Sequence, residues 1–568
     1  MIQTITDKYE KWLKADLPED LRSQLMKLSD DEINDCFYKD LEFGTGGMRG
    51  VMGPGSNRLN IYVIRKVTRA LALYCICNSG KSRAQGIVIS HDNRLHSREF
   101  TLEAAKMLSS YGIKVYIFDD LRPTPELSFA VRKLGATAGI MITASHNPKE
   151  YNGYKVYDRQ GCQLTPGKLA PFLDLLKSMG NEIDTQYGDY KPAGEIITLG
   201  KEIDKSYISR VKSILLNKDL DKSNLKIVFT PQHGTSLEIA KKLFKDLKYR
   251  VTYVTEQCTH DPLFSATDSP NPEMPEAYNL ALEYAKKVDA DIIMATDPDA
   301  DRCGIVIKDK NGNYRLFTGN ETGAMLIDYV LSQRKALGKL HENGIVFDTV
   351  VTSSFGRKIA EYYNMRVESV LTGFKYIGEK IRSHEKARDY EFEFGYEESY
   401  GYLLADFVRD KDSLQALIMI LEMTNYYLLQ GKTLDVVYDE LQQKFGYHRD
   451  KLYSIYFEGQ FGKMKMDSIM EGLRNNPIKE ICGNKLAYFE DYSKSASYNP
   501  DGEFINYIEL PPTDLLKFYF DDGSTIAIRP SGTEPKCKFY YGVVGKSQEE
   551  VDKKPDAFHE EVKNIIGL

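Results

Sequence analysis

The sequence of 568 residues has few features that would direct a protein to a membrane or an oxidising compartment. It holds one tryptophan and eight scattered cysteines, of which only Cys75 and Cys77 lie close together. This pattern gives neither a disulfide framework nor a zinc site and favours a reducing cytoplasm. No run of 18 apolar residues occurs, since even the most apolar helix candidate, residues 414–423, contains Gln415 and Glu422. The N-terminus also lacks the apolar core of a signal peptide, so we expect a cytoplasmic protein without a membrane span.

The charge balance is equally moderate. A formal net charge of −7 is small for this length. It argues against a general nucleic-acid binder and leaves anionic small substrates to local basic pockets. The length is too great for one hydrophobic core, and three to four domains are the natural expectation.

Apolar strand patterns alternate with amphipathic helix patterns, which is typical of mostly parallel sheets with crossover helices. The expected strands are residues 85–90, 114–118, 138–143, 225–230, 250–254, 291–296, 344–350 and 366–370. The expected helices are residues 99–110, 125–134, 236–247, 357–363 and 411–429. The alternation begins three times, so we predict three similar mixed-sheet α/β domains over residues 1–205, 206–318 and 319–447.

The pattern changes near residue 450. Residues 515–520 and 524–529 read as a hairpin, because the intervening Asp521-Asp522-Gly523 supplies the positive φ of a tight turn. A strand at residues 538–544 and a closing helix at 548–566 follow. We therefore predict a fourth domain, residues 448–568, with an antiparallel α+β fold.

The most informative segment is Thr143-Ala-Ser-His-Asn-Pro148, which directly follows the apolar strand pattern at 138–143. Pro148 prevents the strand from continuing, and the loop presents the hydroxyl of Ser145 beside the imidazole of His146. A serine held in this way can act as a nucleophile or as a phosphate carrier.

A second loop, Asp297-Pro-Asp-Ala-Asp-Arg302, follows the strand pattern at 291–296. Asp297, Asp299 and Asp301 would point one way in an extended segment, which Pro298 favours. Three close carboxylates repel one another unless a cation neutralises them, and hard oxygen ligands favour Mg²⁺. A calcium EF-hand and a solvated acidic turn are the alternatives; the EF-hand requires a glutamate where Lys308 stands.

Three further loops carry polar clusters. Glu397-Glu398-Ser399 offers acceptors to sugar hydroxyls, or is a surface turn. Arg529-Pro-Ser-Gly-Thr533 combines a guanidinium, two hydroxyls and backbone N–H groups near a glycine, which is typical of an anion site, with an ordinary β-turn as the alternative. Arg49 lies in the glycine-rich run 43–50, which lacks the Lys-Ser/Thr ending of an ATP-binding phosphate loop.

With these five loops in this order, the chain resembles the α-D-phosphohexomutase superfamily (phosphoglucomutase/phosphomannomutase) from about residue 43 to residue 540. Residues 372–377 and 409–412 resemble the branch with phosphoglucomutase-2-type and phosphopentomutase enzymes. The resemblance implies three α/β domains and a smaller C-terminal domain around a central cleft. One departure is Gly44-Thr-Gly-Gly47, where relatives often have Gly-Thr-Ala-Gly.

The resemblance also implies residue roles. Ser145 would be the phosphoserine and would complete one Mg²⁺ shell with Asp297, Asp299 and Asp301. Arg49, His146, Lys155 and Arg302 would stabilise charge or move protons. Glu397 and Ser399 would bind sugar hydroxyls. The non-transferring phosphate would be held by Lys411, Arg529, Ser531, Gly532, Thr533 and Lys538.

The expected reaction interconverts sugar 1-phosphate and 6-phosphate through a bisphosphate, with glucose 1,6-bisphosphate as activator and intermediate. Glucose phosphate is preferred because Glu397-Glu398-Ser399 resembles the glucose-type pattern more than the Glu-Met-Ser of dual-specificity relatives. Mannose and pentose phosphates remain alternatives. A phosphatase, a sugar-bisphosphate synthase and a catalytically silent binding protein are less favoured readings, since the serine, the aspartates and the Arg529 loop are all present.

Overall fold

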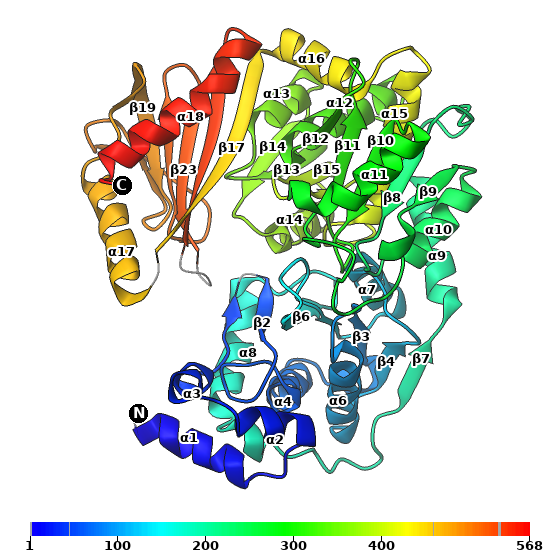
Figure 1. Ribbon diagram of the computed structural model, residues 1–568, viewed down its shortest axis with the longest axis vertical. Helices are drawn as coiled ribbons and strands as arrows, with labels where there is room; N and C mark the ends of the chain where they lie inside the picture. The colour runs from blue at the N-terminus through cyan, green and yellow to red at the C-terminus, as the bar shows by residue number, and fades with distance from the viewer. Residues whose placement is uncertain (1–2, 45, 458, 532–535) are drawn as a thin grey trace. The chain divides into compact units, whose positions relative to one another are not determined.

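The computed structural model describes residues 3–44, 46–457, 459–531 and 536–568. The chain forms two compact units. Figure 1 labels helices and strands of both units. The first contains Met1–Gly319 and Gly373–Thr433, and the second contains Asn320–Thr372 and Leu434–Leu568. Each unit is described below by itself.

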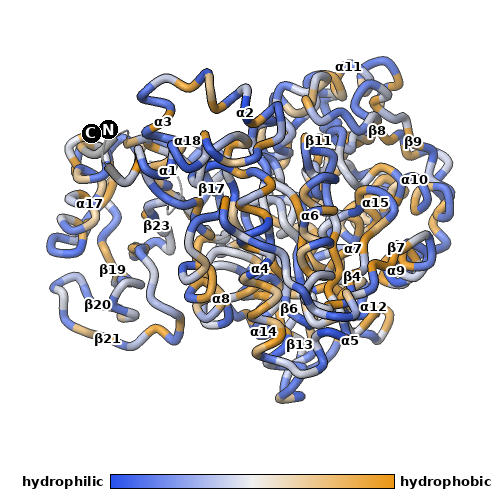
Figure 2. Tube along the Cα trace, turned by 90° about the horizontal axis from the view of Figure 1, so that it is seen from below, coloured by the Kyte–Doolittle hydropathy of each residue, from blue (hydrophilic) through white to orange (hydrophobic). Residues whose placement is uncertain are grey.

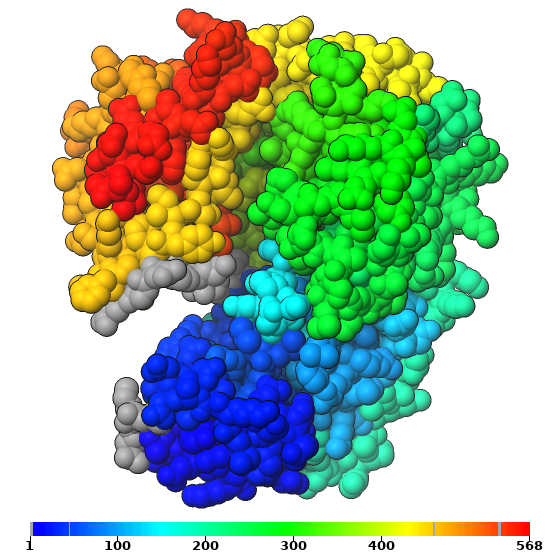
Figure 3. Space-filling model, viewed as in Figure 1, coloured from blue at the N-terminus to red at the C-terminus, as the bar shows by residue number. Residues whose placement is uncertain are grey.

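The N-terminal helices pack around the single tryptophan. They are α1 (Gln3–Lys14), α2 (Glu19–Leu25) and α3 (Asp30–Phe37). Trp12 is fully buried, and its indole N–H donates a 2.8 Å hydrogen bond to Glu182. Ser29 and Glu32 form a reciprocal capping box that fixes the start of α3. These helices occupy the dark blue surface in Figure 3.

A seven-stranded mixed sheet follows in the first unit. Its order is β1 (Phe43–Gly44), β2 (Gly47–Val51), β6 (Tyr151–Asp158), β5 (Ala138–Ile142), β3 (Ile87–His91), β4 (Val115–Phe118) and β7 (Ile196–Leu199). Strands β5, β3, β4 and β7 run parallel to one another. Strand β6 is antiparallel to both β5 and β2. Its associated helices are α4 (Ile61–Asn78), α5 (Ser82–Gln85), α6 (Ser97–Ser110), α7 (Thr124–Leu134) and α8 (Pro166–Ser178).

The second sheet of this unit has five strands. Its order is β12 (Tyr314–Phe317), β11 (Cys303–Lys308), β10 (Ile292–Thr296), β8 (Ile227–Thr230) and β9 (Val251–Tyr253). Strands β10, β8 and β9 are parallel, and β11 and β12 are antiparallel additions. The helices beside it include α9 (Lys201–Ser213), α10 (Leu237–Asp246) and α11 (Asn279–Val288).

The remainder of the first unit is α14 (Phe374–Ala387), the antiparallel pair β15 (Glu391–Glu397) and β16 (Gly401–Leu403), and α15 (Ser413–Leu428). Helix α15 packs against α9 and α10, and Figure 2 shows it as a predominantly apolar segment. Even so, among the described residues no helix combines the length and apolar character needed to cross a membrane.

The second unit holds α12 (Gly319–Ala336) from Asn320 onward, α13 (Ser354–Tyr362), α16 (Leu434–Phe445) and the parallel pair β13 (Gly344–Thr349) and β14 (Arg366–Val370). An antiparallel sheet follows, in the order β17 (Tyr447–Tyr456), β24 (Lys536–Gly545), β23 (Thr525–Pro530), β22 (Leu516–Phe520), β19 (Asn484–Asp491), β20 (Ala496–Tyr498) and β21 (Phe504–Tyr507), with β18 (Glu480–Ile481) paired to β19. Helices α17 (Gly459–Asn475) and α18 (Gln548–Ile565) accompany it.

The predicted hairpin between β22 and β23 is present. Gly523 has φ +87°, the left-handed conformation that the Asp-Gly step predicts. The fold class expected from the sequence, mixed α/β sheets followed by an antiparallel C-terminal domain, is therefore confirmed.

Candidate active site

Ser145 and Asp297 lie side by side, each at the carboxyl end of a strand in a different sheet of the first unit. Ser145 follows β5 and Asp297 follows β10, and both side chains are buried. The Ser145 hydroxyl donates a 2.7 Å hydrogen bond to Oδ2 of Asp297 and lies 3.2 Å from Nδ1 of His146. Ser145 adopts a left-handed backbone conformation with φ 54°, and its N–H donates to the Thr143 hydroxyl at 2.8 Å. The serine is thus held in a strained turn and points at the first aspartate.

A buried arginine that the sequence reasoning did not identify holds this loop. Arg94 donates to the carbonyl oxygens of Ser145, Asn147, Pro148 and Tyr151 at 2.6, 2.5, 2.8 and 2.9 Å. Its charge is balanced by Asp92, which also accepts a 2.6 Å hydrogen bond from Thr143. The available signal was the polar run His91-Asp-Asn-Arg94 directly after the strand pattern ending at 90.

The three aspartates of the second loop converge. Oxygens of Asp297, Asp299 and Asp301 all lie within 4.8 Å of one another, and all three residues are buried. Pro298 led us to expect an extended loop, but the loop forms a turn. Ala300 has φ 57°, and its N–H donates to the Asp297 carbonyl at 3.0 Å. The prediction of an extended segment was wrong because a tight turn, rather than alternation along a strand, brings the carboxylates together.

This cluster fits a divalent cation. Oδ1 of Asp299 and Oδ1 of Asp301 are buried and have no hydrogen-bond partner in the part of the chain that the structure describes. Burial, followed by the charges of Asp299 and Asp301, raises the pKa of Asp297 well above its usual value. Hard carboxylate oxygens without protein donors are the ligand set that Mg²⁺ prefers, and a cation there would relieve the mutual repulsion.

Two lysines partly neutralise the aspartates. Lys155, on β6, places its ammonium 2.6 Å from Asp299 and 3.5 Å from Asp301. Lys411 reaches Asp301 at 3.1 Å. Burial opposes the charged form of Lys411, but Asp301 and other nearby carboxylates outweigh it and raise the pKa of the ammonium. Both lysines are therefore positioned to stabilise negative charge around the cluster.

The side chain of Lys411 packs directly against Gly401, where only a glycine leaves room for it. A Cβ added to Gly401 would lie 2.1 Å from Cδ of Lys411, which is inside the contact distance of two carbon atoms. The lysine side chain therefore passes over the backbone of β16 on its way to Asp301.

Arg49 and His146 lie beside the serine loop. Arg49, on β2, donates a 2.7 Å hydrogen bond to the side-chain oxygen of Asn147. Burial lowers the pKa of Arg49, whereas Asp299 partly offsets this effect. Burial, followed by the charges of Arg302 and Arg49, lowers the pKa of His146 well below its usual value. His146 is therefore a neutral imidazole, and its lowered pKa makes it a weaker base than a free histidine.

Arg302 pairs with Glu273, and its Nε also lies 3.9 Å from Asp301. Burial opposes its charge, but Glu273 and Asp301 outweigh that effect and raise its pKa. The guanidinium is consequently a fixed positive charge beside the third aspartate.

Glu397 ends β15 in the same unit. It is buried and accepts a 2.7 Å hydrogen bond from the N–H of Gly373. Burial raises the pKa of Glu397 to about 7, although Lys411 acts in the opposite direction. Ser399 is half-buried in the turn that follows.

The remaining predicted residues lie in the second unit. Arg529 on β23 and Lys538 on β24 are register partners. The N–H of Ser531 donates to the Lys536 carbonyl at 2.8 Å. Gly532 and Thr533 lie outside the described residues, so the phosphate-holding role of this loop stays a prediction.

Comparison with known proteins places the chain in a family. Four models of the phosphoglucomutase/phosphomannomutase family match in order: alpha/beta/alpha domain I at residues 40–171, domain II at 205–312, domain III at 318–445 and the C-terminal domain at 480–560. A phosphoglucomutase from Staphylococcus aureus (strain MRSA252) is 38% identical over 550 residues, covering 96% of this chain and 98% of the relative.

Two solved structures share the fold. The Paramecium phosphoprotein pp63/parafusin, described as a phosphoglucomutase in its open form, matches with a TM-score of 0.68 at 18% identity, covering 93% of this chain and 94% of its own. The Aspergillus fumigatus N-acetylphosphoglucosamine mutase in complex with GlcNAc-6P and magnesium matches with a TM-score of 0.51 at 13% identity, covering 100% and 99%. Because all four domain models match in order and the S. aureus relative matches almost end to end, this chain belongs to the phosphoglucomutase/phosphomannomutase family of the α-D-phosphohexomutase superfamily and is a sugar-phosphate mutase.

Proposed function

We propose that this enzyme interconverts glucose 1-phosphate and glucose 6-phosphate through a phosphorylated Ser145 and glucose 1,6-bisphosphate. The observation that carries the proposal is the 2.7 Å hydrogen bond from the Ser145 hydroxyl into the buried aspartate cluster. The name of the S. aureus relative supports glucose, and the magnesium and GlcNAc-6P in the A. fumigatus mutase complex support the metal and the class of ligand.

The first half-reaction transfers a phosphoryl group to the substrate. A sugar hydroxyl oxygen forms a bond to the phosphorus as the bond to Oγ of Ser145 breaks, which leaves a bisphosphate and a free serine. The hydroxyl proton moves to a base, and we assign this role to His146 because its Nδ1 lies 3.2 Å from Oγ. The second half-reaction returns the other phosphoryl group of the bisphosphate to Ser145.

The chain's own cations stabilise charge on the transferred group. Lys155 and Arg302 border the aspartates, and Arg49 borders the serine loop. A bound Mg²⁺, held by Asp297, Asp299, Asp301 and the Ser145 oxygen, would supply further electrostatic stabilisation of the phosphoryl oxygens.

Separate groups would bind the rest of the substrate. An ionised Glu397 can accept two hydrogen bonds from sugar hydroxyls, with Ser399 as a further donor or acceptor. We assign the non-transferring phosphate to Lys411, Arg529, Ser531, Gly532, Thr533 and Lys538. The ammonium of Lys411 lies 3.1 Å from Asp301, so this residue also borders the aspartate cluster.

A coupled assay tests the substrate. Glucose 1-phosphate, mannose 1-phosphate and ribose 1-phosphate are supplied with Mg²⁺ and a trace of the corresponding bisphosphate, and each product is detected separately. We expect glucose 6-phosphate to form fastest, with stimulation by glucose 1,6-bisphosphate. Faster turnover of mannose or ribose phosphate would reassign the substrate. Release of inorganic phosphate without isomer would make the protein a phosphatase.

A further inference from the structure

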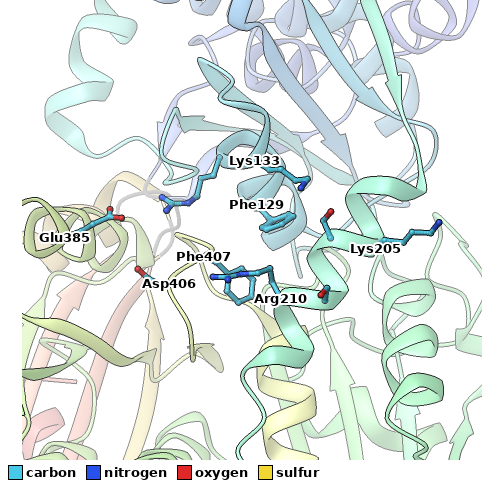
Figure 4. Close-up of a pocket in the computed structure, with 10 residues that line it drawn as sticks. Phe129, Lys133, Lys205, Arg210, Glu385, Asp406 and Phe407 are labelled. Carbon is cyan, nitrogen blue, oxygen red and sulfur yellow. The ribbon is translucent and has the colours of Figure 1, made fainter. Parts of the chain in front are cut away.

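The first unit contains a pocket that shares no residue with the serine and aspartate loops. Its volume is about 790 Å³, and it lies between α7, α9, the end of α14 and the segment that follows β16 (Figure 4). This volume is within the range of about 300–1,000 Å³ that small-molecule sites occupy, and the pocket is largely open to solvent.

Four cationic side chains line the pocket: Arg132, Lys133, Lys205 and Arg210. Over the described residues, none of them forms an ion pair with a carboxylate. Arg132 donates to the backbone and side-chain oxygens of Gln160, and the Arg210 guanidinium lies 5.2 Å from the ring centroid of Phe407. These charges are therefore not committed to acidic groups of the protein.

The two acidic side chains of the lining share one guanidinium, which offsets part of their charge. Asp406 and Glu385 accept hydrogen bonds from the fully buried guanidinium of Arg409 at 3.0 and 2.8 Å. Burial, followed by the charge of Arg409, lowers the pKa of Arg132. An anion in the pocket would consequently meet an excess of positive charge and relieve repulsion between these guanidinium groups.

The rest of the lining is apolar or hydroxylic. The rings of Phe129 and Phe407 meet edge to face with centroids 6.1 Å apart. Ser206 and Ser209 add hydroxyl groups from α9. A ligand that fits this lining carries at least two negative charges together with a flat or apolar part.

We propose that this pocket binds a nucleoside diphosphate, with the diphosphate on the cationic side chains and the base and ribose against the two phenylalanines and the serines. This chemical class combines the negative charge and the planar group that the lining requires.

The pocket wall is also continuous with the active site. Arg409 holds the wall through Asp406, and Lys411 follows two residues later with its ammonium 3.1 Å from Asp301. Ser413 donates to the Ala300 carbonyl at 2.6 Å, in the middle of the aspartate loop. A ligand that shifts residues 406–413 would therefore act on the position of Lys411.

Calorimetric titration with ADP in metal-free buffer tests the proposal on the full chain. The pocket variant is Lys133→Gln/Lys205→Gln/Arg210→Gln. The matched control, Lys201→Gln/Lys245→Gln/Arg250→Gln, removes the same number and kinds of charge from exposed positions outside the pocket. We expect ADP to bind the wild type, to bind the pocket variant at least tenfold more weakly, and to bind the control as it binds the wild type.

Hydrogen exchange with ADP should also show protection in peptides that cover residues 404–413. Absence of ADP binding, or equal weakening in both variants, would overturn the proposal. Neither measurement depends on turnover, so the outcome is independent of the reaction proposed for Ser145.

Discussion

The hydroxyl of Ser145 donates a 2.7 Å hydrogen bond to Asp297 across 152 residues of sequence. Both residues are buried at the ends of strands in two different sheets of the first unit. The protein fold alone therefore holds the serine against a cluster of carboxylates that could bind a metal ion. The following predictions depend on this arrangement.

Removal of divalent metal should stop turnover. The aspartates repel one another, and a cation is expected to organise them together with the serine oxygen. We expect no mutase activity in chelated protein and recovery on addition of Mg²⁺. Asp299→Asn should weaken Mg²⁺ affinity by more than about tenfold, since even outer-sphere partners of a metal are worth roughly 10- to 100-fold.

Glu276→Gln is the matched control, since it removes an exposed carboxylate of the same unit. Full activity in metal-free protein would show that the three aspartates do not act in catalysis through a bound metal ion.

Gly401→Ala should displace Lys411 from Asp301. The new methyl group would lie 2.1 Å from Cδ of Lys411, so the side chain must take another path. We expect kcat to fall by at least about tenfold, the equivalent of 1.4 kcal/mol in the activation barrier. Gly167→Ala is the control because a Cβ there meets nothing within 4 Å. Equal activity in the two variants would show that the position of Lys411 does not matter.

The pH profile should report Glu397. The pKa of its carboxyl is raised to about 7, mainly by burial, and only the ionised form accepts two sugar hydroxyls. The kcat/KM should therefore rise with pH through about 7 in the wild type relative to Glu397→Gln. The substrate's own phosphate titrates equally in both proteins and cancels in this ratio. A ratio that does not change between pH 5.5 and 8.5 would contradict the role of Glu397.

The same shift predicts a stability effect of fixed sign. Because the pKa is higher in the folded state, the stabilising contribution of the Glu397 proton is full below about pH 4.5 and is lost as pH rises through about 7. Glu397→Gln should therefore gain stability relative to the wild type as pH rises across this window, by up to roughly 3 kcal/mol. Urea unfolding at pH 4.5 and pH 8 measures the difference, and the opposite sign would show that burial does not control this carboxyl.

Arg94→Ala should destabilise the protein by about 3–5 kcal/mol, because it leaves Asp92 uncompensated and several carbonyl oxygens without their donor. Arg94→Lys keeps the charge but cannot reach all four carbonyls, so it should restore part of the stability and little of the activity. Arg250→Ala, which removes an exposed arginine, is the control. Full activity in Arg94→Lys would show that the geometry of the serine loop is set elsewhere.

Local sequence patterns predicted the elements that depend on local physics. The strand expected at residues 138–143 is β5 (Ala138–Ile142), and the helix expected at 125–134 is α7 (Thr124–Leu134). Apolar runs and turn residues determine such elements, and the polar loops that follow them could be found in the same way. The convergence of Ser145 with Asp297 was expected from the family resemblance rather than from spacing.

Features that depend on long-range contacts could not be read from the sequence. Nothing in the neighbourhood of Arg94 indicates that its guanidinium binds the carbonyls of residues 145–151. The left-handed conformation of Ala300 replaced the extended segment expected from Pro298. Lys411 was assigned to phosphate binding, but its contact with Asp301 depends on a crossing at Gly401 that no periodicity reveals.

Transfer of a labelled phosphoryl group tests the central claim most directly. The enzyme is labelled with ³²P from glucose 1,6-bisphosphate, freed of small molecules and mixed with excess unlabelled glucose 1-phosphate. The label should reside on Ser145, be absent from Ser145→Ala but present in a control, Ser178→Ala, that alters an exposed serine, and pass to hexose phosphate and bisphosphate on mixing. Label on another residue, or its release only as inorganic phosphate, would contradict a mutase that operates through Ser145.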